Sequence, residues 1–190
     1  MKRVTARISC GLLAVAIGAC GGGGGTGGSP APAGATCAPT DAVLPGDATL
    51  AGMEGTYRVV AVAPDGRRVE GRVEFTERPV DMRSVGRTSL PLEGTAEIDF
   101  AAIGAVAPSG MDSADSQRPG VLVLESDEAS GRRILVRFGA AANDLAQPMF
   151  DGSITRFEPR EIRTDGFLGT WRSGGGRSSS GYFCAWPDGT

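Results

Sequence analysis

The sequence predicts an all-β domain: an antiparallel meander of about eight short strands, with a small barrel favoured over a sandwich. Three observations support this fold class. Most candidate strands alternate apolar and charged residues with a period of two, which indicates a strand with one buried face. Turn-forming residues separate these segments at short intervals, so that hairpins connect antiparallel neighbours. The folded part has no segment with the apolar spacing of a long helix.

The expected strands begin at residue 57. The first hairpin has strands over 57–63 and 68–76 around a Pro-Asp-Gly turn at 64–66. Within the second strand, Val73 and Phe75 belong to an apolar face that alternates with charged residues. Further strands are expected at 95–100, 121–124, 133–138, 152–157 with a continuation through Ile162, 167–172 and 182–186.

Two of these strands have informative patterns. Residues 121–124 are apolar on both faces, whereas 133–138 alternate and should point Ile134, Val136 and Phe138 inward. A polar turn is expected between them.

The connections include two long segments. Residues 101–107 could form one helical turn, which Gly104 and Pro108 limit. The loops over 79–91 and 104–119 are longer than usual connections, and long ordered loops are often functional. Exposed apolar residues in these loops would favour a role in assembly.

The first twenty residues have the features of an export signal. Lys2 and Arg3 precede an apolar run over 8–19, which is shorter than the about 20 residues that span a bilayer. The run ends in Ile-Gly-Ala-Cys at 17–20, which resembles the lipobox of bacterial lipoproteins. The resemblance implies cleavage before Cys20, a diacylglycerol on its thiol and acylation of the new amino terminus. An ordinary signal peptide and a transmembrane anchor are the alternatives.

These features divide the chain into a signal peptide over 1–19, a lipid-anchored Gly/Pro-rich tether over 20–46 and a β-domain over 47–190. Segments rich in glycine and serine behave as flexible coil. Because Gly21 rather than an aspartate follows the cysteine, the resemblance implies the outer membrane, with the domain facing the periplasm or the cell surface.

The cysteine count supports this division. Of four cysteines, Cys10 leaves with the signal peptide and Cys20 takes lipid, so that Cys37 and Cys184 remain. An even pair in an oxidising compartment predicts a disulfide from the end of the tether to the last strand. Two free buried thiols are the alternative.

Composition restricts the chemistry. Removing residues 1–19 takes three of the 19 basic residues and leaves 16 against 22 acidic ones. This acidic balance argues against nucleic acid as a partner. The chain has no histidine, and the mature part has no lysine, which removes the usual activated nucleophiles, the Schiff base and most catalytic zinc sites. The sequence therefore predicts no catalytic residue, metal or cofactor.

Carboxylates are the chemistry that composition leaves open. A hydrolase would need two acids facing one cleft, whereas most acidic residues here fall on solvated strand faces. Residues 111–116 could donate oxygens to calcium, but they lack the alternation and distal glutamate of known loops, which favours a plain polar loop. The arginine pairs at 67–68 and 132–133 are interpreted as solvated turn and edge charges.

A short motif recurs at strand starts. Gly-Thr-aromatic occurs at 55–57 and 169–171, and Gly-Thr-Ala at 94–96. The first two resemble the Gly-x-Trp strand start of lipocalins and the Gly-Thr-Trp start of avidins. The resemblance implies a barrel in which Tyr57 and Trp171 pack across the barrel ends. The alternative is that these aromatics simply close the core.

Together these patterns predict a membrane-anchored envelope lipoprotein with a non-catalytic β-domain that binds a small apolar ligand or a protein partner. The ligand-binding residues are not identifiable from the sequence. A structural or assembly subunit of an envelope complex and a carboxylate-dependent hydrolase are the alternatives.

Overall fold

The computed structural model describes residues 36–49, 52–85, 88–106, 108, 120–129, 131–139, 155–174 and 178–189. The signal peptide, the lipidation site Cys20 and the calcium-loop candidate at 111–116 lie outside these residues. Among the described residues, no helix is long and apolar enough to cross a membrane.

The described residues form nine strands and two short 3-10 helices. In chain order these are β1 (Gly55–Val62), β2 (Arg68–Glu77), η1 (Val80–Met82), β3 (Ser84–Val85), β4 (Thr88–Glu97), η2 (Phe100–Ile103), β5 (Val121–Glu128), β6 (Gly131–Phe138), β7 (Thr155–Arg163), β8 (Gly166–Ser173) and β9 (Ser179–Pro187).

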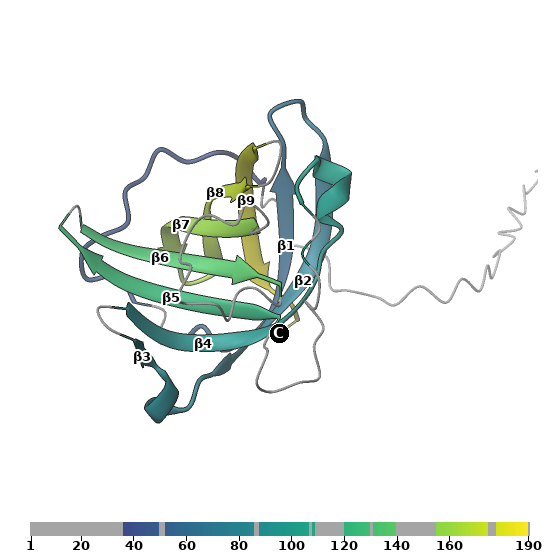
Figure 1. Ribbon diagram of the computed structural model, residues 1–190. Coiled ribbons are helices and arrows are strands. Elements are labelled where there is room, and N and C mark those ends of the chain that lie inside the picture. Colours follow the sequence, from purple (N-terminus) through teal and green to yellow (C-terminus); the bar gives the residue numbers. More distant parts are fainter. Residues whose placement is uncertain are drawn as a thin grey trace, which may run out of the picture.

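All strand pairs are antiparallel, and the sheet closes on itself (Figure 1). Consecutive strands pair from β4 to β9, β9 pairs with β1, and β2 pairs with both β1 and β4. The described residues thus form an eight-stranded barrel, with the two-residue β3 added beside β4. This confirms the predicted all-β meander and the barrel in preference to the sandwich.

The period of two correctly identified the inner faces of β2 and β6. Val73 and Phe75 are 1% and 2% exposed, and the predicted inward residues Ile134, Val136 and Phe138 are all buried in the same core. On β2 the alternate neighbours Arg72 and Glu74 are charged and exposed, whereas on β6 the alternate neighbours include Leu135 and the buried Arg137. In β5 both faces are apolar. Its Leu122 and Leu124 form a separate cluster with Leu90 and Leu135 on the outside of the barrel.

Strand β4 is longer than the sequence predicted. The predicted loop over 79–91 contains η1, β3 and the start of β4, so a long loop was the wrong interpretation there. Pro91 and Gly94 obscured the strand. Proline is tolerated where the ladder is irregular, and the β4–β5 register shifts between Ser89 and Leu92. Gly94 is required because a Cβ there would lie 1.7 Å from the backbone oxygen of Glu74 on the neighbouring strand.

The predicted strand over 95–100 also ends early. Phe100 begins η2 instead, and the single helical turn expected over 101–107 is η2, which ends before Gly104. The next strand was expected to begin at residue 152, but residues 152–154 lie outside the described part. Strand β7 begins at Thr155 and includes the continuation that was expected through Ile162.

A column of aromatic rings fills the barrel from the η2 end to the opposite end. The Phe157 and Phe183 rings stack in the middle with centroids 4.3 Å apart. Both side chains are at most 1% exposed. The rings in the column are, in spatial order, Phe100, Phe138, Phe157, Phe183, Phe167, Tyr57 and Phe75. This column occupies the space that a ligand takes in a hollow barrel.

The two aromatics of the recurrent motif lie at opposite ends of the barrel. Tyr57 packs on Phe75 and Phe167, and the fully buried Trp171 donates its indole N–H to the Val62 carbonyl oxygen at 3.0 Å. Room for the indole comes from Gly181 on β9, where a Cβ would lie 2.5 Å from the indole nitrogen.

Hydroxyl groups close the η2 end of the barrel. Thr155 and Ser173 are buried on adjacent strands with their oxygens 2.9 Å apart. The Thr155 hydroxyl donates to the Val106 carbonyl oxygen at 2.9 Å, and the Val106 N–H donates to Ser173 Oγ at 2.8 Å. The chain that follows η2 is thereby fixed across this end.

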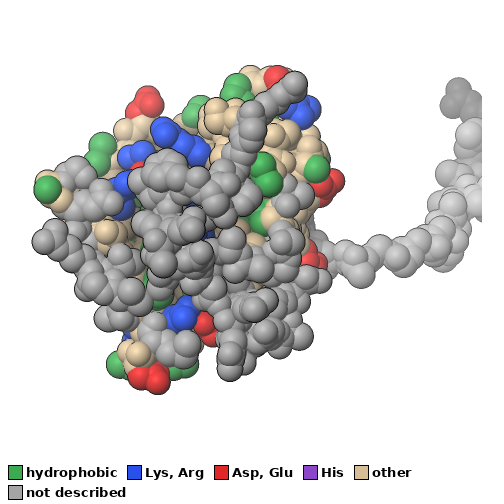
Figure 2. All heavy atoms as spheres, viewed as in Figure 1, with side chains coloured by type: hydrophobic (Ala, Val, Ile, Leu, Met, Phe, Trp, Pro, Cys, Tyr) green, Lys and Arg blue, Asp and Glu red, His purple; other side chains and the backbone are tan. Residues whose placement is uncertain are grey.

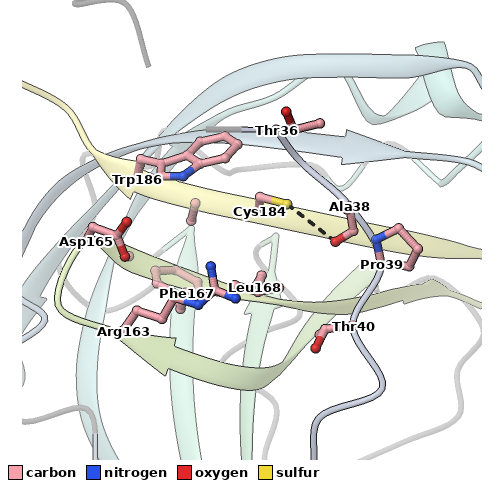
Figure 3. A pocket seen from close by; sticks show the side chains of 12 residues that line it. Thr36, Ala38, Pro39, Thr40, Arg163, Asp165, Phe167, Leu168, Cys184 and Trp186 are labelled. Carbon is pink, nitrogen blue, oxygen red and sulfur yellow. Dashed lines mark hydrogen bonds between the residues drawn. The ribbon is translucent and has the colours of Figure 1, made fainter. Parts of the chain in front are cut away.

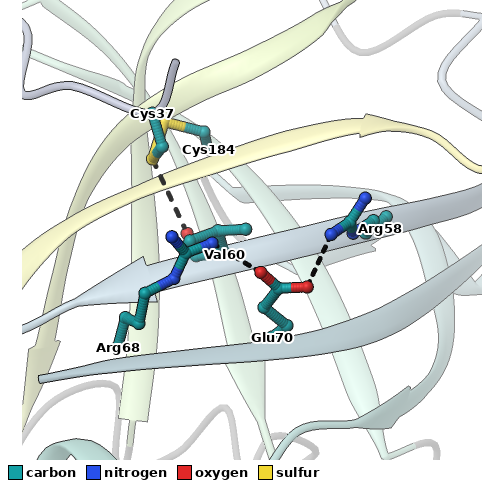
Figure 4. Close-up of polar contacts among 6 residues, drawn as sticks. All are labelled: Cys37, Arg58, Val60, Arg68, Glu70 and Cys184. Carbon is teal, nitrogen blue, oxygen red and sulfur yellow. Dashed lines mark hydrogen bonds and ion pairs between the residues drawn. A yellow bond between two sulfur atoms is a disulfide. The ribbon is translucent and has the colours of Figure 1, made fainter. Parts of the chain in front are cut away.

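Residues 36–49, named here the strap, lie along the outside of the barrel. The predicted disulfide joins Cys37 on the strap to Cys184 on β9, with the two Cα atoms 5.6 Å apart (Figure 4). Farther along, Thr40 donates to the Glu161 carboxylate at 3.2 Å, and Leu44 packs against the barrel core. The described end of the expected tether is therefore attached to the domain.

Candidate functional site

Two pockets among the described residues border the strap, and both lie outside the aromatic column. The first, the disulfide pocket, has a volume of about 380 Å³ and lies between the strap and β8–β9. The second, the seam pocket, has a volume of about 510 Å³ and lies where β6 and β7 separate.

The disulfide pocket covers an apolar patch of the barrel wall (Figure 3). Trp186 is 9% exposed and packs with Val60 and Cys184 beneath the strap. At its rim, Arg163 pairs with Glu161 at 2.6 Å. The hydrogen bond from Arg163 is the main reason that the pKa of Glu161 lies below its ordinary value. The charged residues of the lining are therefore Arg163, which already pairs with Glu161, and Asp165.

The seam pocket exists because the β6–β7 ladder is short. Among the residues that the structure describes, these strands pair from Val136 to Phe138 on β6, opposite Thr155 to Phe157 on β7. Beyond that point β7 contains Pro159, which has no N–H to donate, and its register with β8 shifts between Pro159 and Glu161. The strands separate there, and the strap lines the resulting pocket.

Arginine dominates the lining of this pocket. Arg132, Arg133, Arg160 and Arg172 line it, and Glu158 is the one carboxylate among its described lining residues. Both oxygens of Glu158 are engaged, Oε1 by Arg160 at 3.0 Å and Oε2 by Arg133 at 3.4 Å. Arg132 reaches outward to Glu125 at 2.5 Å.

A row of arginines crosses the outer face beside the pocket. Arg137 on β6 is the cross-strand partner of Arg156 on β7, which is in turn the partner of Arg172 on β8. Like charges placed directly opposite each other destabilise a sheet. Burial lowers the pKa of Arg156, and the charges of Arg133 and Arg172 lower it further, while Glu158 opposes this shift.

Arg156 and Arg172 are unmatched within the described part of the chain. Neither forms an ion pair with a carboxylate there, and the buried Nε of Arg156 has no hydrogen-bond partner. Figure 2 shows basic and acidic side chains on one face of the molecule, so positive charge is not general to the surface.

The structure describes some of the site residues expected from the sequence and leaves others outside its described part. The Cys37–Cys184 disulfide is present, and Cys20 lies outside the described residues. Arg67 and Arg68 are exposed and paired, as expected of turn and edge charges, whereas Arg132 and Arg133 instead line the seam pocket. Sequence reasoning missed this pocket because its arginines come from three strands whose register is not visible in the sequence.

The described residues give limited support to two alternatives, a metal site and a carboxylate hydrolase. No group of three or more His, Cys, Asp or Glu side chains is placed there to hold a metal ion. Each of the two pockets has one carboxylate in its lining, Asp165 in the disulfide pocket and Glu158 in the seam pocket. A carboxylate hydrolase requires two.

Comparisons with known proteins do not assign a family. No protein-family model matches the chain, and no curated protein matches it. The solved structure of EF1p2_mFAP2b bound to DFHBI is similar to it at 11% identity and a TM-score of 0.35, over 70% of this chain and 92% of that chain. A likeness this low carries no argument about function.

Proposed function

We propose that this protein is a lipid-anchored envelope protein whose barrel is a non-catalytic scaffold and whose ligand binds outside the barrel, in the seam pocket. One observation carries the binding part of the proposal. The aromatic column fills the interior, while a pocket of about 510 Å³ lies outside it. Small-molecule pockets have volumes of about 300–1,000 Å³.

The anchoring part of the proposal rests on the lipobox resemblance at 17–20 and on the closed pairing of the other two mature cysteines. Two or three acyl chains hold a protein on a membrane where one chain does not. The paired Cys37 and Cys184 leave Cys20 as the free thiol of the mature chain for lipidation.

Anchoring is tested by feeding labelled palmitate to cells that produce the full chain. The wild type and a Cys10→Ser control should carry the label and stay with high-salt-washed membranes. Cys20→Ser should lose the label while the disulfide still forms. A labelled Cys20→Ser variant would refute lipidation at this residue.

Binding at the seam pocket is tested by filling it. Gly46 lines the pocket, and a Cβ at this position would meet nothing within 4 Å, so Gly46→Trp can place an indole there without backbone strain. Val80 is 77% exposed on η1, and Val80→Trp is the matched control. Native mass spectrometry of the full chain, isolated in detergent from cell envelopes, should show a bound small molecule that Gly46→Trp loses and Val80→Trp keeps.

A protein partner is the second candidate occupant of this surface. Val43 lines the same pocket and is 80% exposed, which leaves an apolar side chain that a partner could cover. A photo-crosslinking residue at position 43 should then give one discrete adduct in intact cells, whereas the same residue at position 74, an exposed polar position on β2, should give none. Adducts that do not differ between the two positions would argue against this alternative.

A further inference from the structure

The lining of the seam pocket contains four arginines and one carboxylate, so positive charge is in excess there. Arg156 and Arg172 are direct cross-strand partners on β7 and β8, and Arg137 is the partner of Arg156 on β6. Opposed like charges are unfavourable unless something of opposite sign lies between or above them. The nearest carboxylate in the pocket lining is Glu158, whose two oxygens are already engaged by Arg133 and Arg160.

The carboxylate in the pocket lining is thus engaged by arginines other than Arg156 and Arg172. Glu125, the next acid, is paired with Arg132. Arg156 and Arg172 remain without an ion pair in the part of the chain that the structure describes, and Arg156 keeps a buried Nε that donates to no acceptor. The mature chain as a whole has more acidic than basic residues, so this is a local concentration of positive charge in an acidic protein.

Guanidinium groups suit one class of ligand. Their planar donors match the oxygens of carboxylate and phosphate groups, which they bind with paired, charge-assisted hydrogen bonds. Arg172 on β8 and Arg160 on β7 both line the seam pocket, so an oxyanion in the pocket can contact donors from two strands. The pocket is also larger than a single ion requires.

We infer that the seam pocket is an oxyanion-binding site that takes a small molecule bearing two or more phosphate or carboxylate groups, with Arg172 as its principal donor and Arg156 adding positive charge from the neighbouring strand. This inference rests on the proposed function, because it names the ligand class of the same pocket. Arg133 and Arg160 hold Glu158 in place and set one border of the site.

The test titrates pyrophosphate and, separately, citrate into the full chain in a non-ionic detergent, at constant ionic strength, by calorimetry. The wild type should bind each probe saturably. Arg172→Gln should weaken binding about tenfold or more, because it removes charge-assisted hydrogen bonds. Arg172→Lys keeps the charge but loses the planar fork, and it should weaken binding by less than Arg172→Gln.

The matched control is Arg68→Gln. It removes the same charge from an arginine that is 59% exposed on β2 and paired with Glu70, away from the pocket. Binding should change less than twofold. No saturable binding of either probe to the wild type would overturn the inference, as would an equal loss in Arg68→Gln, which would mean a response to net charge alone.

Further experiments distinguish a lipid headgroup from a soluble anion as the ligand. They also distinguish failure of the oxyanion inference from failure of the proposed function. Mixed micelles containing phosphatidylglycerol that displace pyrophosphate would identify a lipid headgroup as the source, and failure to displace it would identify a soluble anion. If Gly46→Trp removes a bound molecule in the native spectra while neither oxyanion binds, the oxyanion inference fails and the proposed function stands. If the oxyanions bind equally well to Gly46→Trp, the site is not the seam pocket, and the inference fails.

Discussion

The interior of the barrel and its outer face at β6–β8 satisfy opposite requirements. Inside, apolar rings such as Phe157 and Phe183 pack in contact, and the few buried polar groups, such as Thr155 and Ser173, are hydrogen-bonded. Outside, like charges are opposed at Arg156 and Arg172. The interior contributes stability through burial, while the outer face gives up some stability to keep donors available.

This difference implies that stability and binding can be perturbed separately. A change in the aromatic column should lower the free energy of unfolding without selecting a ligand. A change in the arginine row should alter binding while the fold persists.

The largest effect is expected inside. Phe157 is 1% exposed and contacts Phe100, Phe138 and Phe183, so Phe157→Ala should lower the unfolding free energy by about 3–5 kcal/mol. Urea unfolding followed by tryptophan fluorescence measures it. Phe157→Leu leaves a smaller void and should lose clearly less. A loss under about 1 kcal/mol in the alanine variant would show that the column is not the source of stability.

The next effect concerns the strap. Replacing both Cys37 and Cys184 by alanine should lower the unfolding free energy by about 2–4 kcal/mol, since the disulfide restricts the unfolded chain. Because the strap brings Gly46 to the seam pocket, pyrophosphate binding should weaken as well. A reductant should reproduce both effects in the wild type and leave the double variant unchanged. If a reductant left the unfolding free energy of the wild type unchanged, this stabilising role of the disulfide would be contradicted.

A smaller effect on stability, with a large one on binding, is expected from charge reversal on β8. Arg172→Glu places a carboxylate opposite Arg156 and should raise the unfolding free energy by about 0.2–1 kcal/mol while abolishing pyrophosphate binding. Arg172→Gln is the control, since it removes the repulsion without adding an attraction and should be the less stable of the two. Equal stabilities would mean that the two positions do not interact.

The smallest effect is expected at a surface ion pair on β1–β2 (Figure 4). The hydrogen bond from Arg58 lowers the pKa of Glu70 below its ordinary 4.5. The carboxylate form is thus favoured in the folded state, so the pair stabilises the fold above pH 4.5 and loses this effect as the pH falls through the lower folded pKa. Solvent screening limits the contribution to below about 1 kcal/mol.

Unfolding of Glu70→Gln and the wild type should therefore differ at neutral pH and converge in acid. Glu74→Gln is the control on the same strand, because Glu74 forms no ion pair among the described residues. A difference that grows in acid would contradict the sign of the pKa shift.

Different parts of the structure were predictable for different reasons. The inner faces of β2 and β6 follow from alternation, which each strand displays within its own residues. The Cys37–Cys184 pair follows from counting, since the sequence assigns Cys10 to the expected signal peptide and Cys20 to the expected lipid anchor. The start of β4 was missed because Pro91 and Gly94 are read locally as breakers, although they serve a bulge and a close strand approach.

The sequence by itself determined the strand class, the hairpin order and the disulfide, because these depend on neighbouring residues and on the number of cysteines. Only the tertiary structure decided that the barrel is filled, that β6 and β7 separate and that Arg156 meets Arg172. Each of these depends on cross-strand register and ring packing between residues distant in the chain. Closure of the barrel sets both the cross-strand register and the ring packing, and no local sequence pattern encodes how the barrel closes.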